Sequence, residues 1–235
     1  MKRILFSLIA IGLLFIYSCE KNESESVTPN QTPEGYSLGW SDEFEDSNLS
    51  MTNWNYETGD GTEYGLPAGW GNNEKQIYTT SAANSSIKTE DGNSVLAITA
   101  VQDDAGGFTS AKLTTKNLMT MRFGRIDIKA KMPEGQGIWP ALWMLGNNLN
   151  SVGWPACGEI DIMEHPTNEV TRIYGTVHTG IYNLFEGPFP PRGSSTDVPD
   201  AESAFHLYAM EWTPESIDFF VDDQLYYSFE NDNGS

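Results

Sequence analysis

The sequence predicts an all-β fold, a sandwich or a barrel, from three observations. Apolar and polar residues alternate with a period of two along many short segments, as in strands that have one face on a core. Clusters of Gly, Asn, Asp and Pro separate these segments at regular spacing. No helical pattern of ten residues occurs outside an apolar run at the N-terminus, and no internal repeat suggests a propeller.

Composition narrows the class of protein further. The chain of 235 residues carries 13 Lys+Arg against 33 Asp+Glu, a formal net charge of −20. Phosphate neutralisation needs clustered cations, so a general nucleic-acid binder is excluded. Hydrophobic residues at 39% and aromatic residues at 12% suffice for a packed core. We expect a single globular domain that is a monomer.

The first 18 residues resemble a bacterial lipoprotein signal peptide. Lys2 and Arg3 precede an apolar run over 4–17, whose length is typical of a signal h-region and short for a membrane span. The run ends at Cys19, which such a signal leaves as the lipidated first residue of the mature chain. An ordinary secretory signal with an incidental Cys is the alternative. We expect an exported lipoprotein in the outer membrane or at the cell surface.

A flexible tether is predicted over residues 19–35, which are polar, acidic and contain Pro. Acidic residues directly after the lipidated Cys also resemble the signals that send lipoproteins to the cell surface in some Gram-negative bacteria. The folded domain is then expected over 36–235. Because Cys19 and Cys157 are the two cysteines, no disulfide framework is predicted. Carboxylates near Cys157 favour a small buried side chain over a nucleophile.

Strands are expected one after another from Tyr36 onward. The clearest, over 126–132, alternates apolar and charged residues, which predicts one face on the core and one in water. Asp222 and Asp223 are expected to form the turn of a hairpin whose second strand covers 225–229. The other expected strands cover residues 94–101, 108–115, 170–179, 205–213 and 216–221.

Residues 158–165, Gly-Glu-Ile-Asp-Ile-Met-Glu-His, contain three acids. Regular alternation places Glu159 and Asp161 on one face of a strand and turns Glu164 toward the core. One extra residue, a β-bulge near Met163, returns Glu164 to the face of the other two. We therefore predict a carboxylate row, Glu159, Asp161 and Glu164, on one open surface.

The residues alone leave three uses for the carboxylate row open. Hydrolysis of a glycosidic bond needs an ionised carboxyl beneath the anomeric carbon and a protonated carboxyl beside the leaving oxygen, and a third acid keeps a neighbour protonated. A metal site is the second use, in which the acids and His165 bind Ca²⁺ or another hard cation. The third is a merely solvated face of an edge strand.

Aromatic residues favour a sugar-binding site. The chain contains seven Trp, ten Tyr and eleven Phe. An exposed indole stacks on a sugar ring, whose hydroxyls need amide and carboxylate partners. Trp70 lies in a Gly-rich segment beside Asn73 and Glu74, which makes it the stronger ligand candidate. Trp139 and Trp143 lie in an apolar run, where core and cleft are equally favoured.

Several of these segments together resemble glycoside hydrolase family 16, and in particular its laminarinase-like endo-β-1,3-glucanases. The bulged Glu-x-Asp-x-x-Glu pattern is the most specific element, and the resemblance covers about residues 36–230. It implies a β-jelly-roll sandwich of two antiparallel sheets, with a substrate cleft across the concave face and retention of anomeric configuration. The matching segments are residues 40–44, 69–79, 123–126, 137–146, 158–165 and 175–178.

The resemblance implies a role for each candidate residue. Glu159 would be the nucleophile, Glu164 the general acid/base, and Asp161 the acid that tunes and orients both. His178 would lie beside the carboxylate row, although a hydrogen-bonded strand His is the alternative. A retaining mechanism needs the two carboxyls about 5–5.5 Å apart, so both Glu side chains must lean inward. Positions that contact sugars in the family match Asn73, Glu74, Trp139 and Trp143.

The implied substrate is a neutral β-glucan of the laminarin type, because so acidic a chain repels sulfated galactans. A mixed-linkage β-1,3-1,4-glucanase and a non-catalytic, cell-surface glucan-binding lipoprotein are the alternatives. The family pattern continues beyond the last hairpin, so we expect the domain over 36–235 to lack its C-terminal strands. No cofactor is required. The structural Ca²⁺ of many relatives is put in doubt, because one of its ligands comes from the missing end.

Overall fold

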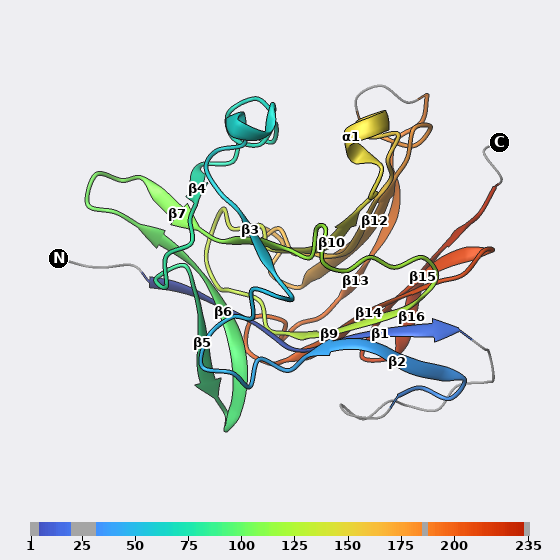
Figure 1. Ribbon diagram of the computed structural model, residues 1–235, viewed down its shortest axis with the longest axis horizontal. Helices are drawn as coiled ribbons and strands as arrows, with labels where there is room; N and C mark the ends of the chain where they lie inside the picture. The colour runs from blue at the N-terminus through green and yellow to red at the C-terminus, as the bar shows by residue number, and fades with distance from the viewer. Residues whose placement is uncertain (1–4, 20–31, 185–187, 233–235) are drawn as a thin grey trace. The chain divides into compact units, whose positions relative to one another are not determined.

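The computed structural model describes residues 5–19, 32–184 and 188–232 (Figure 1). The basic start of the expected signal (1–4) and most of the expected tether (20–31) lie outside the described residues. Within the described ranges the helices are a 3-10 turn, Thr62–Tyr64, and one short α-helix, α1 (Leu149–Val152). No helix in this part of the chain is long and apolar enough to cross a membrane. The all-β prediction is confirmed.

The described residues form two compact units, those within 1–12 and 42–120 and those within 13–41 and 121–235. The first unit contains an antiparallel hairpin whose turn, Asp91-Gly92, has positive φ angles at both residues. The expected strand over 108–115 is divided at the buried Ala111 into two short strands with different partners. The strands of this unit are β3 (Asn55–Glu57), β4 (Gln76–Tyr78), β5 (Ser85–Glu90), β6 (Asn93–Gln102), β7 (Phe108–Ser110) and β8 (Lys112–Thr114).

An N-terminal strand, β1 (Leu5–Cys19), coincides with the apolar run expected to be a signal h-region. It pairs antiparallel with β6, with Leu5 opposite Val101. A further strand, β2 (Tyr36–Asp42), pairs with β1. The run therefore forms a strand in this structure, and removal of the segment on export stays a prediction.

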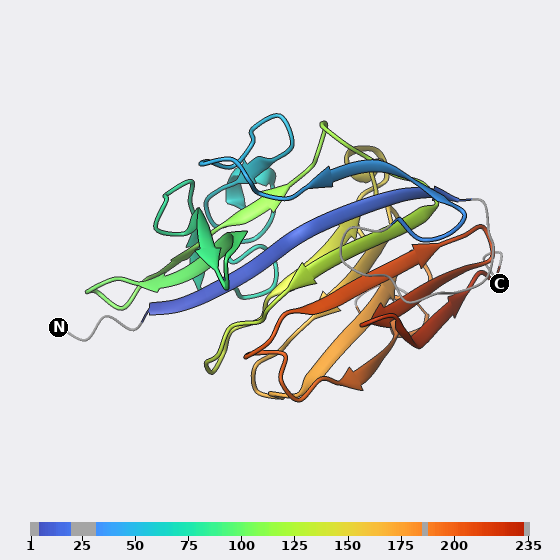
Figure 2. The ribbon, with the colours of Figure 1, turned by 90° about the horizontal axis from the view of Figure 1, so that it is seen from below.

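The second unit is a sandwich of two antiparallel sheets. Strands of the first sheet run side by side in the order β16-β15-β14-β9, as Figure 2 shows. The second sheet has the order β10-β11-β12-β13. The bounds of the first sheet's strands are β9 (Gly124–Ala130), β14 (His206–Trp212), β15 (Ser216–Val221) and β16 (Gln224–Glu230). Those of the second are β10 (Ala141–Leu145), β11 (Glu159–Glu164), β12 (Arg172–His178) and β13 (Arg192–Asp197).

The core of the sandwich lies between these two sheets, where β13 packs on β16 and β11 on β14. Its fully buried side chains come from both layers: Met163 and Ile173 from the second sheet, and Tyr208, Met210 and Phe219 from the first. Burial of this apolar area is the main stabilising contribution. The opposite face of the second sheet is thereby left available for polar side chains.

Strand β9 corrects one prediction. Its alternation is regular and Lys129 and Lys131 are partly exposed, but the expectation that the charged face lies in water is wrong at Asp127, which is 1% exposed beside the 7% exposed Arg125. Arg125 Nε donates to Asp127 Oδ1 at 2.8 Å, and Arg125 Nη2 donates to Asp223 Oδ1 at 2.8 Å. Burial raises the pKa of Asp127 to about 6, although the charge of Arg125 opposes the shift. A period of two cannot distinguish this buried ion pair from a solvated face.

Candidate active site

Strand β11 contains the predicted β-bulge. On its ladder with β12, Asp161 lies opposite Thr176 and Glu164 lies opposite Tyr174, so three steps on β11 match two on β12. The ladder with β10 is shifted at the same place. The extra residue therefore falls between Asp161 and Glu164, where Met163 is fully buried. The prediction of a bulge near Met163 is confirmed.

The bulge brings Glu164 to the face that carries Asp161. Thr176, directly across the ladder from Asp161, donates its hydroxyl to Glu164 Oε2 at 3.3 Å. Trp139 Nε1 donates to Glu164 Oε1 at 3.0 Å. Burial, and then the charge of Asp161, raises the pKa of Glu164 to about 7, and the two hydrogen bonds oppose this shift. Glu164 can therefore keep a proton near neutral pH, as a general acid requires.

Glu159 lies at the start of the same strand and has a donor of its own. Trp154 Nε1 donates to Glu159 Oε2 at 2.9 Å. Burial, and then the charge of Asp161, raises the pKa of Glu159 to about 7, against the opposing effects of His178 and of the Trp154 hydrogen bond. One oxygen of the carboxyl is therefore oriented by an indole, which leaves the other free to react.

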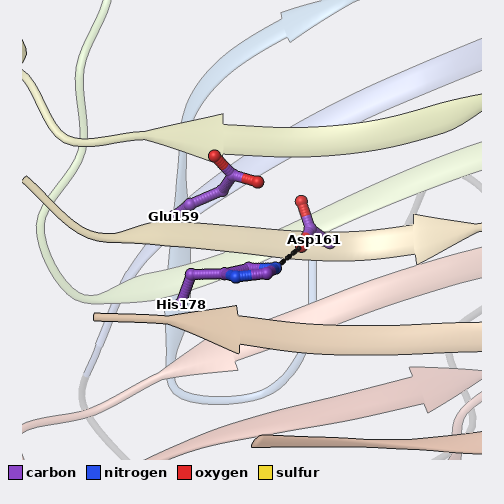
Figure 3. Close-up of side chains that lie close together, drawn as sticks. All are labelled: Glu159, Asp161 and His178. Atoms are coloured by element: carbon purple, nitrogen blue, oxygen red, sulfur yellow. Dashed lines mark ion pairs between the residues drawn. The ribbon is translucent and has the colours of Figure 1, made fainter. Parts of the chain in front are cut away.

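Asp161 and His178 connect the two strands at the centre of the site (Figure 3). Asp161 is 4% exposed, and its Oδ2 lies 3.3 Å from His178 Nε2. Burial by itself lowers the pKa of His178, but the hydrogen bond and charge of Asp161, followed by the charge of Glu159, raise it overall. The buried Nδ1 of His178 has no hydrogen-bond partner among the described residues. His178 thus lies beside the carboxylate row, as the resemblance implies.

Two of the three candidate indoles lie at the surface. Trp139 is 66% exposed and Trp143 is 38% exposed, so neither belongs to the core. Trp139 is linked to Glu164 by its hydrogen bond, and Trp143 lies opposite Asp161 on the ladder between β10 and β11. Each offers an aromatic face on which a sugar ring can stack.

Trp70, in contrast, is buried, and the expectation of an exposed stacking surface at this position is wrong. The residue is 6% exposed, with ring centroids 5.0 Å from Tyr64 and 5.7 Å from Tyr78. Lys112 Nζ lies 3.8 Å from the centre of its ring. The Gly-rich segment folds back on itself, and the large indole fills the small core that results.

The polar neighbours of Trp70 belong to the first unit as well. Glu74 Oε2 accepts hydrogen bonds from Gln76 Nε2 and Tyr78 Oη, both at 2.7 Å. Asn73 is exposed and adopts a φ of 59°. The carboxylate row lies in the second unit, so the substrate contacts expected of Asn73 and Glu74 stay predictions.

His165 does not join the carboxylate row, although the metal interpretation included it. It is fully buried, its Nδ1 lies 2.9 Å from the carbonyl oxygen of Arg172, and its Nε2 lies 3.3 Å from Glu202 Oε1. The histidine that can act with the acids is His178. One candidate ligand atom from each of Glu159, Asp161 and His178 lies within 4.8 Å of the others.

Sequence reasoning missed two hydrogen-bond donors of the site. Thr176 precedes His178 by two residues, so a period of two along β12 could have placed it on the same face. Trp154 precedes Glu159 by five residues in a Gly-Trp-Pro segment, and only its indole in a turn-rich stretch could have indicated a role. Both donors orient carboxyls that the sequence did identify.

Cys157 behaves as the sequence predicts for a thiol near acids. It is partly buried, and burial is the main cause that raises its pKa, with a further contribution from the charge of Glu159. A raised pKa disfavours the thiolate at neutral pH. Cys157 is therefore no candidate nucleophile.

A β-sandwich with two glutamic acids that titrate near neutral pH, a buried aspartate between them and exposed indoles beside them is the arrangement of a carboxylate-dependent glycoside hydrolase. Residues 73–235 match the family Glycosyl hydrolases family 16. The chain belongs to this family, and its fold is the β-jelly roll of the family's laminarinase structures.

Relatives with known activities have similar sequences. A beta-glucanase from Rhodothermus marinus is 43% identical over 202 residues, which cover 84% of this chain and 66% of the relative. Glucan endo-1,3-beta-glucosidase A1 from Niallia circulans is 36% identical over 84% of this chain and 30% of its own length. The crystal structure of the laminarinase from Flavobacterium sp. UMI-01 matches with a TM-score of 0.74 at 39% identity, over 85% of this chain and 80% of that one. This chain thus spans less than two thirds of the length of the first two relatives.

Proposed function

We propose that the protein is an endo-β-1,3-glucanase that cleaves internal bonds of laminarin-type β-glucan with retention of configuration. The observation that carries the proposal is the bulge in β11, which brings Glu164 to the face of Asp161 and beside the exposed Trp139. A strand that only presented acids to solvent would have no need of a bulge at this position, nor of two partly buried glutamates whose pKa values are both raised to about 7.

The proposed reaction uses the two glutamates in turn. Glu159 in its ionised form attacks the anomeric carbon, and the bond to the leaving oxygen breaks as that oxygen takes the proton of Glu164. The resulting glycosyl ester on Glu159 is then attacked by water. Glu164, now ionised, takes a proton from this water, and the ester bond breaks to return Glu159 as a carboxylate.

The neighbours of the two glutamates set their protonation. Asp161 disfavours a second negative charge on Glu164 and so keeps the acid protonated. His178, bonded to Asp161, supplies positive charge that favours the ionised form of Glu159. Trp154 and Trp139 each orient one carboxyl oxygen, of Glu159 and of Glu164 respectively. The charge of Asp161 raises the pKa of both glutamates and the charge of His178 lowers both, so near pH 7 the site can hold one proton between the two carboxyls.

Substrate choice follows from charge and from the relatives. With 13 basic against 33 acidic residues, the chain repels sulfated polymers. Relatives at 43% and 36% identity are named a beta-glucanase and a glucan endo-1,3-beta-glucosidase, which supports a neutral β-glucan. Mixed-linkage β-glucan is the alternative that product analysis distinguishes.

Incubation of the protein with laminarin, lichenan and carrageenan tests the proposal. We expect short oligosaccharides from laminarin, with the β-anomer appearing first by NMR. Glu159→Gln and Glu164→Gln should each lower reducing-end release by a factor of about 10³ or more while laminarin binding survives. Glu169→Gln, which removes an exposed acid outside the carboxylate row, is the matched control and should keep full activity. Binding without cleavage by the unmodified protein would indicate the glucan-binding lipoprotein instead.

We also propose that the protein is exported and anchored through a lipid on Cys19. The basic pair at the start of the chain, the apolar run and the Cys at its end support this. Expression in a Gram-negative host should give a membrane-bound product whose N-terminal peptide carries acyl chains by mass spectrometry, and Cys19→Ser should abolish the modification. Recovery of an intact N-terminus, with Leu5–Cys19 retained, would contradict the proposal.

A further inference from the structure

The centre of the carboxylate row has the composition of a transition-metal site. We propose that Glu159, Asp161 and His178 bind Zn²⁺, and that the bound ion prevents glucan cleavage. The binding half of this inference is independent of the proposed function, and only the inhibitory half rests on it. Figure 3 shows the three side chains, two from β11 and one from β12, turned toward one space.

The geometry fits a zinc ion closely. Zinc takes His nitrogen and carboxylate oxygen at about 2.0–2.2 Å in a tetrahedron, so neighbouring ligand atoms lie roughly 3.3–3.6 Å apart. Asp161 Oδ2 and His178 Nε2 are 3.3 Å apart, which is one edge of such a tetrahedron. The ligand atom of Glu159 lies within 4.8 Å of the other two, so a shift on the order of 1 Å in a flexible side chain completes a three-ligand site. The fourth position is left for water.

The ring nitrogen of His178 that faces the acids is Nε2. His178 is 9% exposed, and its buried Nδ1 has no hydrogen-bond partner in the described part of the chain. Its polar link to a neighbouring side chain is the one from Nε2 to Asp161. A bond from the Nε2 lone pair to zinc therefore replaces one hydrogen bond, and the neutral ring then carries its proton on Nδ1. The buried Asp161, 4% exposed, needs no reorientation because the same oxygen already faces His178.

The charge balance also favours a dication. The charges with the largest effects on the pKa of Glu159 are those of Asp161, His178 and Glu164, and those with the largest effects on the pKa of Glu164 are Asp161 and His178. A divalent ion neutralises the row more fully than one imidazolium can. The imidazole ligand selects zinc over Ca²⁺ or Mg²⁺, which prefer six or more oxygen ligands.

A second histidine with two acids shows by contrast what such a site requires. His206 Nδ1 lies 2.7 Å from Asp222 Oδ2, and His206 Nε2 lies 3.3 Å from Asp200 Oδ1. The two carboxylates thus face different nitrogens of one ring and cannot converge with it on a single ion. His206 is therefore a matched control for His178.

Zinc binding is tested by calorimetric titration of the full chain with zinc chloride at pH 7. We expect one site, with affinity lowered about tenfold or more by His178→Gln and by Glu159→Gln. His206→Gln removes a histidine whose two acids cannot converge on one ion and should bind zinc within about threefold of the unmodified protein. Glu164→Gln removes charge from the same row but no ligand, so it should lose less affinity than Glu159→Gln. Unchanged binding by His178→Gln, or an equal loss in Glu164→Gln and Glu159→Gln, would overturn the site.

Inhibition is tested separately, with laminarin as substrate. Zinc should raise KM and leave kcat unchanged, because the ion occupies the position that the sugar needs, and EDTA should restore the original rate. Stoichiometric zinc binding without inhibition would overturn the inhibitory half. Zinc binding by a protein that cleaves no glucan would contradict the proposed function and leave the metal site standing.

Discussion

His165 and Glu202 form a pair directly behind the proposed acid: His165 follows Glu164 in the chain, is fully buried, and has its Nε2 3.3 Å from Glu202 Oε1. Its other ring nitrogen lies 2.9 Å from the carbonyl oxygen of Arg172, and its backbone N–H donates to the carbonyl oxygen of Pro140 at 3.1 Å. The residue after Glu164 is thereby fixed from three sides. This arrangement positions the end of the bulged strand.

Substitution of His165 should therefore lower both stability and turnover. His165→Ala leaves buried polar partners unsatisfied, so the free energy of unfolding should fall by about 1–3 kcal/mol. We expect kcat to fall by a larger factor than that by which KM changes. Glu164 loses its fixed position, while the exposed Trp139 stays in place. Urea unfolding and laminarin kinetics measure the two effects. Equal stability of His165→Ala and the unmodified protein would show that the pair does not anchor the strand.

Activity should depend on pH as a narrow bell with its maximum near pH 7. Glu159 must be ionised and Glu164 protonated, and the pKa of each is raised to about 7. Rates of laminarin cleavage should thus fall below about pH 6 and above about pH 8. The charge of Asp161 contributes to both shifts, so Asp161→Asn should move both limbs to lower pH. A profile with an unmoved alkaline limb in Asp161→Asn would contradict this coupling.

The indole N–H groups of Trp139 and Trp154 should each affect one limb of the pH–activity profile. Trp139→Phe keeps an aromatic face but removes the N–H that stabilises ionised Glu164, so the pKa of Glu164 and the alkaline limb should rise, by less than about one unit. Trp154→Phe removes the corresponding donor to Glu159 and should raise the acid limb instead. Profiles of kcat/KM against pH for the two variants measure these shifts. If both variants had the same pH profile as the unmodified protein, neither hydrogen bond would affect the pKa of its carboxyl.

The sequence was sufficient for the parts of this site that depend on periodicity. A period of two predicts strands, and an acid that regular alternation would bury predicts a bulge, because a buried unpaired charge costs far more than one extra residue. Glu159, Asp161 and Glu164 could thus be placed on one face before any coordinates.

Contacts between distant parts of the chain could not be predicted in this way. Arg125 and Asp127 form a buried ion pair, and Asp223, 98 residues from Arg125, supplies a second carboxylate to the guanidinium. Likewise Trp70 lies in a polar, Gly-rich segment typical of an exposed loop, yet Tyr78 and Lys112 cover it. In each case the local pattern is compatible with two environments, and tertiary packing selects one.

Removal of the charge of Glu164 should raise the free energy of unfolding, and only at higher pH. The pKa of Glu164 is about 7 in the folded chain and about 4.5 when unfolded, so between these values the native state binds a proton that the unfolded state lacks. The contribution of Glu164 to the free energy of unfolding is therefore fully present below about pH 4.5 and is lost as the pH rises through 7. Glu164→Gln abolishes the loss, so its unfolding free energy should exceed that of the unmodified protein by up to about 3 kcal/mol at pH 8 and by little at pH 4.

Urea unfolding at these two pH values measures the difference, with Glu169→Gln as the control for loss of an exposed acid. The control removes an exposed acid outside the carboxylate row, so it separates the effect of losing any surface carboxylate from the effect of losing Glu164. A gain in Glu164→Gln that is equal at both pH values would point to improved packing by the amide. A gain in unfolding free energy confined to pH 8 would mean that the folded site disfavours the ionised form of Glu164. The same effect keeps the carboxyl protonated near neutral pH, as a general acid requires.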